Sequence, residues 1–351
     1  MLVSDTAPRA QPTRRALPAQ PEGVPWPAGP WPTGAPGPPV DSAGLAILLD
    51  QAMTEPTGEL GTTLAVVIVH RGRLVAERYG PGTGAETALL SWSMAKSITH
   101  ALTGLVVGSG RLEPGARAEV PEWAADDDPR HPITVQQLLN MASGLAFSED
   151  YVDAGVSDVI EMLFGAGQHD VAAFAAASPL VHPPGTVWDY SSGTTNIVSR
   201  LLGQIVGGGH EGMAAFINDE LFVPLAMRSA TATFDDAGTF VGSSYVHATA
   251  QDYARFALLY LRDGVWDGRR VLPEGWVDHA RAPARGSDGT YGAHWWLHPE
   301  PPGTFYAAGY EGQYLFVVPA LDLIVVRLGK TSADLRPALE TWLHTVIACF
   351  G

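Results

Sequence analysis

The stretch Ser93-Met94-Ala95-Lys96, which opens the apolar segment 93–108, decides how this sequence is interpreted. In a helix, residues three apart are neighbours on one face, so this spacing brings a hydroxyl and an amine together. The first turn of a helix also favours developing negative charge, because the helix dipole is positive there. The pattern predicts a Ser-Lys pair in which Ser93 is the nucleophile and Lys96 takes its proton.

The composition supports a chemical role for Lys96. Of the 21 basic residues, only Lys96 and Lys330 are lysines, so this chain uses arginine wherever a positive charge is enough. A buried amine can lose its proton, whereas a guanidinium effectively cannot. The alternative interpretation is a lysine that merely snorkels from a structural helix.

A second stretch, Trp188-Asp189-Tyr190-Ser191-Ser192-Gly193, places Tyr190 between a Pro-Gly turn and an apolar helix. A phenol beside an ammonium has its phenolate form favoured, so Tyr190 could relay the proton from Ser93 to a leaving group. The alternative is an ordinary helix start, with Tyr190 over a core and Ser191 or Ser192 as the N-cap.

A third stretch, Ala307-Ala308-Gly309-Tyr310-Glu311-Gly312-Gln313, puts small residues and glycines between two predicted strands. Glycines permit close backbone approach by a substrate, so we expect Gly309, Glu311 and Gly312 to line its site. The Tyr310 N–H and the Ser93 N–H would bind the oxyanion. An ordinary hairpin turn is the alternative interpretation.

The surrounding pattern predicts an α+β fold. Residues 1–40 carry closely spaced prolines and should form an extended arm, pinned to the body by Trp26 and Trp31. Residues 41–110 and 256–351 should form one α/β subdomain around a shared antiparallel sheet. Residues 111–255 should form a mostly helical subdomain without a strand pair. The predicted strands are 62–69, 74–79, 292–297, 303–308, 313–318 and 321–328, and helices are expected at 93–108, 252–262 and 335–350.

Length, charge and composition narrow the function classes. The 351 residues, 46% of them hydrophobic, suffice for one large core or two fused ones. A net charge of −16 repels phosphate backbones and anionic lipid, so we expect no nucleic-acid partner and no membrane partner. Without a signal-peptide pattern or a long apolar run, a cytoplasmic location is expected. The expected partner is a neutral or cationic small molecule, and a homodimer is left open.

We expect no metal and no cofactor. The single cysteine, Cys349, allows neither a disulfide nor a cysteine-based metal cage. The 11 histidines show no H-x-x-x-H or H-E-x-x-H spacing, and 242–245 fails as a Gly-x-Ser-x-Gly elbow. His247 and His294 could line a pocket, although a satisfied core or surface histidine is the alternative.

The order of Ser-x-x-Lys, Tyr-Ser-Ser and a Gly-rich strand turn resembles the serine β-lactamase and penicillin-binding-protein-like superfamily over about residues 41–351. Within it, Ser148-Glu149-Asp150-Tyr151-Val152-Asp153 is similar to a segment of the 6-aminohexanoate-dimer hydrolases, which degrade nylon oligomers, and the chain also resembles related carboxylesterases. The resemblance implies that Tyr151 closes over the substrate and touches its leaving amine. We also expect Ser192 and Trp296 to contact the substrate.

Two departures from that superfamily shape the expected activity. β-Lactamases and transpeptidases carry a cation, usually in Lys-Thr-Gly, on the third strand, where this chain has none. The stretch Lys330-Thr331-Ser332 imitates that motif but is interpreted as a strand-end turn. The nylon-oligomer enzymes use an acidic residue downstream of the Tyr151 equivalent, where this chain has Met162.

The expected protein is therefore a serine hydrolase that cleaves carboxylic esters or linear amides, with Ser93, Lys96 and Tyr190 as its catalytic residues. Two alternatives remain. One is a catalytically silent binding or sensor domain on the same fold. The other is a weak β-lactamase or D-Ala-D-Ala peptidase.

Overall fold

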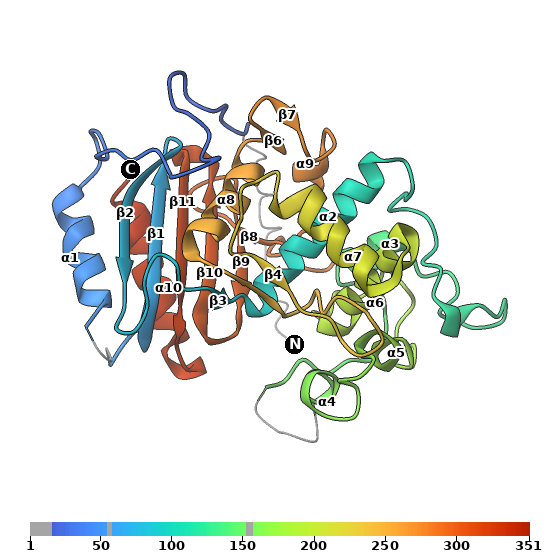
Figure 1. The fold of residues 1–351 in the computed structure, drawn as a ribbon. Coiled ribbons are helices and arrows are strands. Elements are labelled where there is room, and N and C mark those ends of the chain that lie inside the picture. Colours follow the sequence, from blue (N-terminus) through green and yellow to red (C-terminus); the bar gives the residue numbers. More distant parts are fainter. Residues whose placement is uncertain (1–15, 55–57, 152–156) are drawn as a thin grey trace, which may run out of the picture.

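The computed structural model describes residues 16–54, 58–151 and 157–351. Its centre is a six-stranded antiparallel sheet in the order β2-β1-β11-β10-β9-β8, so strands from both ends of the chain pair side by side, as predicted (Figure 1). The strands are β1 (Thr62–His70), β2 (Arg73–Tyr79), β8 (Trp296–His298), β9 (Thr304–Gly309), β10 (Gln313–Val318) and β11 (Leu323–Lys330).

Both faces of the sheet are covered, which explains why its central strands are mostly apolar on both faces. Alternate residues of β1 point to opposite faces. Val66 and Ile68 pack in a core with α1 (Ser42–Ala52) and α10 (Arg336–Ala348). Val67 and Val69 enter a larger core, shared with α2 (Ala95–Gly108) and α8 (Ala250–Leu261), which continues into the helical part of the molecule. Figure 1 shows α1 on one side of the sheet and the helical part on the other.

The middle of the chain is mostly helical, as predicted, but the expectation of no strand pair there was wrong. Strand β5 (Val246–Ala248) pairs with β4 (Thr231–Ala232) and with β3 (Leu89–Leu90). These strands are two or three residues long, too short for an alternating pattern to be recognised. The remaining elements are α3 (Val135–Leu139), α4 (Asp158–Phe164), α5 (Val171–Ala176), α6 (Ser192–Val206), α7 (Gly209–Ile217), α9 (Trp276–Ala280) and the hairpin β6 (Val265–Trp266) with β7 (Arg269–Arg270).

Over the described residues 16–40, the N-terminal arm forms no helix and lies on the body. Trp31 is buried, its indole N–H donates to the Gln251 carbonyl at 3.3 Å, and the Arg255 guanidinium lies 5.5 Å from its ring centroid. Trp26 packs against Trp266 with ring centroids 5.3 Å apart. The two tryptophans thus anchor the arm. Within the described parts of the chain, every helix is too short or too polar to span a membrane.

Candidate active site

Ser93 lies in a tight turn that leads into α2. The turn is a 3₁₀ segment, Trp92–Met94, and Trp92 adopts the left-handed backbone conformation with φ of 45°. Ser91 holds the turn against the small sheet: its N–H donates to the Val246 carbonyl at 2.8 Å, and its hydroxyl donates to the Ser244 carbonyl at 3.1 Å. Such strain persists only where neighbouring structure enforces it. It presents the half-buried Ser93 at the N-terminal end of α2.

Lys96 reaches Ser93 from the first turn of α2, as the spacing predicted. Its Nζ donates to Ser93 Oγ at 3.0 Å, to Ser192 Oγ at 2.9 Å and to the Ser243 carbonyl at 3.1 Å. The side chain is only 1% exposed. Burial lowers the pKa of Lys96 to about 8, although the negative charge of Glu149 works in the opposite direction. An amine with such a pKa can exchange a proton near neutral pH.

Tyr190 joins the pair at the start of α6. Its ring centroid lies 4.8 Å from Lys96 Nζ, and its ring stacks on Trp296 at 5.3 Å between centroids. Burial, followed by the charge of Glu149, raises the pKa of Tyr190, and a hydrogen bond with Ser93 opposes this increase. The phenol therefore stays protonated. This direction is opposite to the favoured phenolate that was expected, because burial has the largest effect on the pKa of Tyr190.

The helix-capping interpretation of the Tyr-Ser-Ser stretch is also correct, alongside the functional one. Ser191 is the N-cap of α6, and its hydroxyl accepts a hydrogen bond from the Thr194 N–H at 3.2 Å. Capping satisfies an otherwise free N–H in the first turn. It also fixes the next residue, Ser192, with its hydroxyl against Lys96.

The Gly-rich stretch forms a turn beside the nucleophile. Strand β9 ends at Gly309, which pairs with Gln313, and the turn between them contains Glu311 with φ of 60°. A Cβ on Gly309 would lie 2.4 Å from the Ser91 carbonyl oxygen and 3.1 Å from Trp92 Cβ. Gly309 therefore lets the strand approach the turn that carries Ser93, a role for this glycine that the sequence did not predict. The next residue along, Tyr310, packs edge-on against Trp92 at 5.6 Å between ring centroids.

Two polar residues for which the sequence did not predict a role, Gln313 and Arg327, hold the backbone of this turn through hydrogen bonds. The Gln313 amide donates to the Tyr310 carbonyl at 2.9 Å. Arg327 is fully buried and donates to the Gly312 carbonyl at 2.9 Å. A Cβ on Gly312 would lie 2.8 Å from Arg327 Nη1, so glycine is required for this packing.

The Lys330-Thr331-Ser332 stretch is a strand-end turn, as interpreted. Lys330 is the exposed last residue of β11, and the Thr331 N–H donates to the Glu311 carbonyl at 2.9 Å. This contact ties the backbone of Glu311 to the end of β11. The contact with the Gly-rich turn is therefore made by the backbone of this stretch.

Tyr151 lies over the Gly-rich turn. Its ring stacks on Tyr310 with centroids 4.9 Å apart, and its hydroxyl donates to Glu149 Oε1 at 2.8 Å. Glu149 also accepts from the Ser192 N–H at 2.8 Å and the Ser192 hydroxyl at 2.5 Å. The sequence alone did not predict a role for Glu149. Val152 and Asp153 of the same stretch lie outside the described residues.

The other candidates pack as structural residues. Met162 is fully buried and its sulfur accepts from the Asn196 amide at 3.5 Å. His294 is a core histidine: its ring bonds Thr195 at 3.2 Å, and burial lowers its pKa to about 3. Among the described residues, no three or more His, Cys, Asp or Glu side chains gather in a way that could hold a metal ion.

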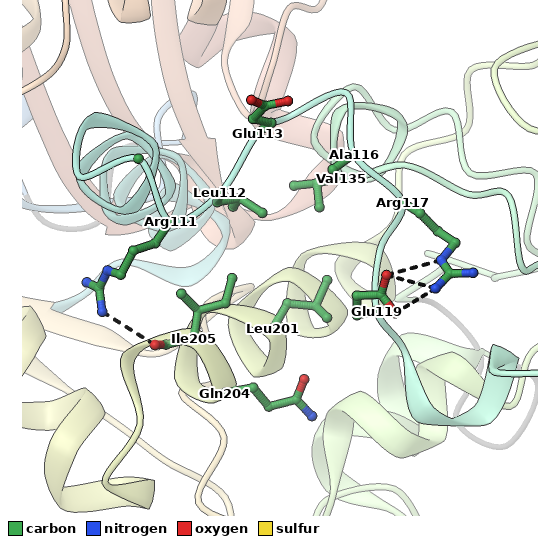
Figure 2. A pocket seen from close by; sticks show the side chains of 11 residues that line it. Arg111, Leu112, Glu113, Ala116, Arg117, Glu119, Val135, Leu201, Gln204 and Ile205 are labelled. Atoms are coloured by element: carbon green, nitrogen blue, oxygen red, sulfur yellow. Dashed lines mark hydrogen bonds and ion pairs between the residues drawn. The ribbon is translucent and has the colours of Figure 1, made fainter.

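A separate groove of about 460 Å³ lies at the C-terminal ends of α2 and α6, away from Ser93 (Figure 2). Its apolar floor includes Leu112, Leu201 and Ile205, and charged side chains such as Arg117 and Glu119 stand at its rim. These residues follow the C-terminal end of α2 or belong to the C-terminal half of α6. The groove is therefore no part of the Ser93 site.

The site joins Ser93, Lys96, Tyr190 and the Gly-rich turn in one cluster, which is the arrangement that the family resemblance implied. The sequence model of the family described as Beta-lactamase matches residues 49–348. The chain belongs to the β-lactamase family. The match includes all three motifs and the whole central sheet.

Relatives within the β-lactamase family differ in the activities that their names state. The 6-aminohexanoate-dimer hydrolase of Paenarthrobacter ureafaciens is 28% identical over 292 residues, covering 76% of this chain and 72% of that protein. A Bacillus anthracis structure with a provisional assignment as a 6-aminohexanoate-dimer hydrolase superposes with a TM-score of 0.73 at 20% identity, covering 91% of this chain and 87% of that one. A family VIII carboxylesterase gives a TM-score of 0.67 at 13% identity, covering 90% and 99%. At these structural identities the likeness shows the fold alone.

Proposed function

We propose that this protein is a serine hydrolase that cleaves carboxylic esters or linear amides through an acyl-enzyme on Ser93. The observation that carries the proposal is the buried amine of Lys96, 3.0 Å from Ser93 Oγ and with a pKa lowered to about 8. A lysine that served only as a charge would gain nothing from such burial.

In this reaction, neutral Lys96 takes the Ser93 proton as Ser93 Oγ bonds to the acyl carbon of the substrate. The N–H groups of Ser93 and Tyr310 are proposed to bind the negative oxygen of the tetrahedral intermediate. The proton then passes from Lys96, with the phenol of Tyr190 as relay, to the departing alcohol or amine. Water attacks the acyl-enzyme in the second half-reaction and regenerates Ser93.

Charge supports neutral substrates. The stretch Thr304–Val318, which contains β9, the Gly-rich turn and β10, has no Lys or Arg. A carboxylate-bearing β-lactam would therefore lack the strand-borne cation on which β-lactamases rely. One cation outside the motifs acts on the site: Arg336, exposed at the start of α10, opposes the increase in the Tyr190 pKa. We propose that Tyr151 and Trp296 contact the substrate, since both flank Ser93 through their stacked partners Tyr310 and Tyr190.

The relatives named for 6-aminohexanoate-dimer hydrolysis support linear amides as a second substrate class. In this chain, Met162 is buried where those enzymes are expected to carry an acid, so an ammonium-bearing nylon dimer loses that partner. We therefore expect a higher kcat/KM for esters than for nylon-type amides.

The test is covalent labelling with a fluorophosphonate ester, read by intact-mass spectrometry and peptide mapping. We expect one adduct, on Ser93, and its complete loss in Ser93→Ala. The matched control is Ser109→Ala, which removes a hydroxyl at the other end of α2. An adduct elsewhere, or a wild-type protein that stays unlabelled, would refute the proposal and favour a silent binding domain.

Substrate class is tested with p-nitrophenyl esters, nitrocefin and linear aminohexanoate oligomers. Neutral short-chain esters should exceed nitrocefin at least about tenfold in kcat/KM, a difference of about 1.4 kcal/mol in transition-state binding. Arg336→Ala should lower nitrocefin turnover more than it lowers ester turnover. Nitrocefin turnover equal to that of the best ester would overturn this substrate class.

A further inference from the structure

The hydrogen bonds of Lys96 restrict how it can act as a base. Three acceptor atoms surround its Nζ: Ser93 Oγ at 3.0 Å, Ser192 Oγ at 2.9 Å and the Ser243 carbonyl at 3.1 Å. An ammonium can donate to all three, but a neutral amine has two hydrogens and one lone pair. After deprotonation, one partner must therefore become the donor. The Ser243 carbonyl cannot donate, so the choice lies between Ser93 and Ser192.

The hydrogen bond between Ser192 and Glu149 determines which of the two hydroxyls can donate to neutral Lys96. Ser192 Oγ lies 2.5 Å from Glu149 Oε1, and an ionised carboxylate only accepts, so the single hydroxyl hydrogen of Ser192 is committed to Glu149. The carboxylate is itself held in place, because its Oε2 accepts from the Ser192 N–H at 2.8 Å and its Oε1 accepts from the Tyr151 hydroxyl at 2.8 Å. Ser192 must then accept from Lys96, and the lone pair of neutral Lys96 faces Ser93.

We propose that Glu149 is a positioning residue that acts through Ser192 to aim the lone pair of Lys96 at the Ser93 hydroxyl. The inference rests on the proposed function, since it concerns the proton transfer that activates Ser93. In that step the Ser93 O–H bond breaks and a Lys96 N–H bond forms, as Ser93 Oγ forms its bond to the acyl carbon. A Ser192 hydroxyl that donated to Lys96 would occupy the same lone pair and compete with Ser93.

Glu149 affects Lys96 in two ways with opposite signs. Its negative charge favours the ammonium and so raises the pKa of Lys96 against the effect of burial. That charge slows acylation below the pKa of Lys96, because fewer molecules hold a neutral amine. The alignment through Ser192 speeds acylation at every pH at which the amine is neutral. A pH profile therefore separates the two effects.

Glu149→Gln tests the alignment with almost no change of shape. The Ser192 N–H can only donate, so the oxygen of the new amide must face it, and the amide NH₂ then faces Ser192 Oγ. The hydroxyl of Ser192 now accepts from the amide, and its hydrogen is free to turn toward Lys96. The substitution thus reverses the hydrogen bond on which the proposal depends.

The experiment measures the second-order rate constant of Ser93 phosphonylation by a fluorophosphonate ester between pH 5.5 and 9.5. The reaction breaks the P–F bond, forms the Ser93 O–P bond and releases fluoride and a proton, so it needs the same base. In the wild-type protein the rate should rise to a plateau with an apparent pKa of about 8. In Glu149→Gln the apparent pKa should be lower, by roughly half to one pH unit, and the plateau about tenfold lower.

A double-mutant cycle with Ser192→Ala shows whether Glu149 acts through Ser192. Once the hydroxyl is absent, nothing competes for the lone pair of Lys96, so adding Glu149→Gln should change the plateau by less than about twofold. The decrease in the apparent pKa should persist in that background, because it depends on charge alone. A tenfold plateau loss in both backgrounds would overturn the proposal.

Two further variants complete the design. Glu149→Asp keeps the charge but withdraws the carboxylate from Ser192, so the plateau should fall while the apparent pKa stays near the wild-type value. Glu149→Asp also tests the alignment of Lys96 through Ser192 if Glu149→Gln does not fold. Asp150→Asn removes a neighbouring exposed charge and should keep the wild-type plateau.

The two levels of proposal fail in different ways. A wild-type protein that is not phosphonylated on Ser93 would refute the proposed function. A wild-type protein that is phosphonylated, together with Glu149→Gln and Glu149→Asp plateaus equal to the wild-type one, would refute only the role of Glu149.

Discussion

Helices α2 and α6 run from the Ser93 cluster to the groove, and their two ends have opposite characters. At the N-terminal ends, Lys96 and Ser192 are buried, and each makes hydrogen bonds to defined partners. At the C-terminal ends, about 20 Å away along a helix of this length, leucine and isoleucine side chains form an open floor. The charged pair there, Arg117 with Glu119, is largely exposed.

The two ends differ in whether water reaches their polar side chains. Exposed charges at the groove can replace a protein partner with water, so their ion pairs contribute little to the free energy of unfolding. At the catalytic end, water is excluded from Lys96, and every hydrogen bond direction is set by the neighbouring atoms. Substitutions at the two ends of the same helices should therefore have very different effects.

The largest effect is expected from Lys96→Arg. The substitution preserves the positive charge but removes the proton acceptor, since a guanidinium does not deprotonate at working pH. We expect kcat for a p-nitrophenyl ester to fall about 10²–10⁴-fold, the usual size of a general acid–base contribution. The matched control is Lys330→Arg, at the exposed end of β11, which should retain wild-type kcat. Near-normal turnover in Lys96→Arg would make Lys96 a purely electrostatic residue.

A smaller effect is expected from Gly309→Ala, which adds one methyl group beside the nucleophile turn. Its Cβ would lie 2.4 Å from the Ser91 carbonyl oxygen, so β9 must move away and carry the Tyr310 N–H with it. Because removing an oxyanion donor costs about 10²–10³-fold in kcat, a displaced donor should cost about tenfold or more. Thermal stability should fall as well.

The control for Gly309→Ala is Gly203→Ala, on α6 near the groove. A Cβ there meets nothing within 4 Å. Alanine is favoured over glycine within a helix by about 1 kcal/mol, so this variant should be equally active and slightly more stable. Equal behaviour of the two variants would mean that the packing of β9 on Ser91 does not position the oxyanion donor.

The sequence predicted the chemical groups better than it predicted their surroundings. Ser93 and Lys96 lie within one helical turn, so their contact follows from local geometry alone. Glu149 contacts Ser192, 43 residues away in the sequence, and Arg327 contacts Leu60, 267 residues away. Such contacts depend on the tertiary fold, so no local pattern in the sequence predicts them.

The difference between local patterns and tertiary surroundings also explains which predictions were wrong. The strands β3, β4 and β5 are only two or three residues long, so they have no periodic pattern that the sequence could reveal. The protonation state of Tyr190 depends on burial, which the motif itself does not specify.

Three buried or half-buried histidines, His100 on α2, His279 on α9 and His294 before β8, should make the stability acid-sensitive. Burial lowers the pKa of His279 to about 4 and of His294 to about 3, and keeps that of His100 well below its usual value. In the unfolded chain these side chains titrate near pH 6.5, so the unfolded state binds more protons below that pH. Stability is therefore present above about pH 6.5 and is lost as the pH falls toward 4.

Each histidine that must stay neutral should reduce the free energy of unfolding by about 1.5 kcal/mol between pH 6.5 and pH 5. Urea midpoints at pH 7, 6 and 5 measure the slope. His279→Gln removes one such group and should flatten it, whereas His169→Gln, whose native side chain is 69% exposed, should leave it unchanged. A slope that is the same in all three proteins would mean that other groups control acid unfolding.

The smallest effect is expected at the groove itself, where Arg117→Ala and Glu119→Ala break an exposed ion pair. The side chains are 41% and 74% exposed, so solvent replaces the lost partner, and the free energy of unfolding should change by less than about 0.5 kcal/mol. Because Ser93 lies about 20 Å away at the other end of α2, kcat and KM for a p-nitrophenyl ester should match the wild-type values. Steady-state kinetics and urea unfolding on both variants check this. A severalfold change in kcat with unchanged stability would show that the two ends of α2 and α6 are coupled, and that the groove influences the alignment of Lys96.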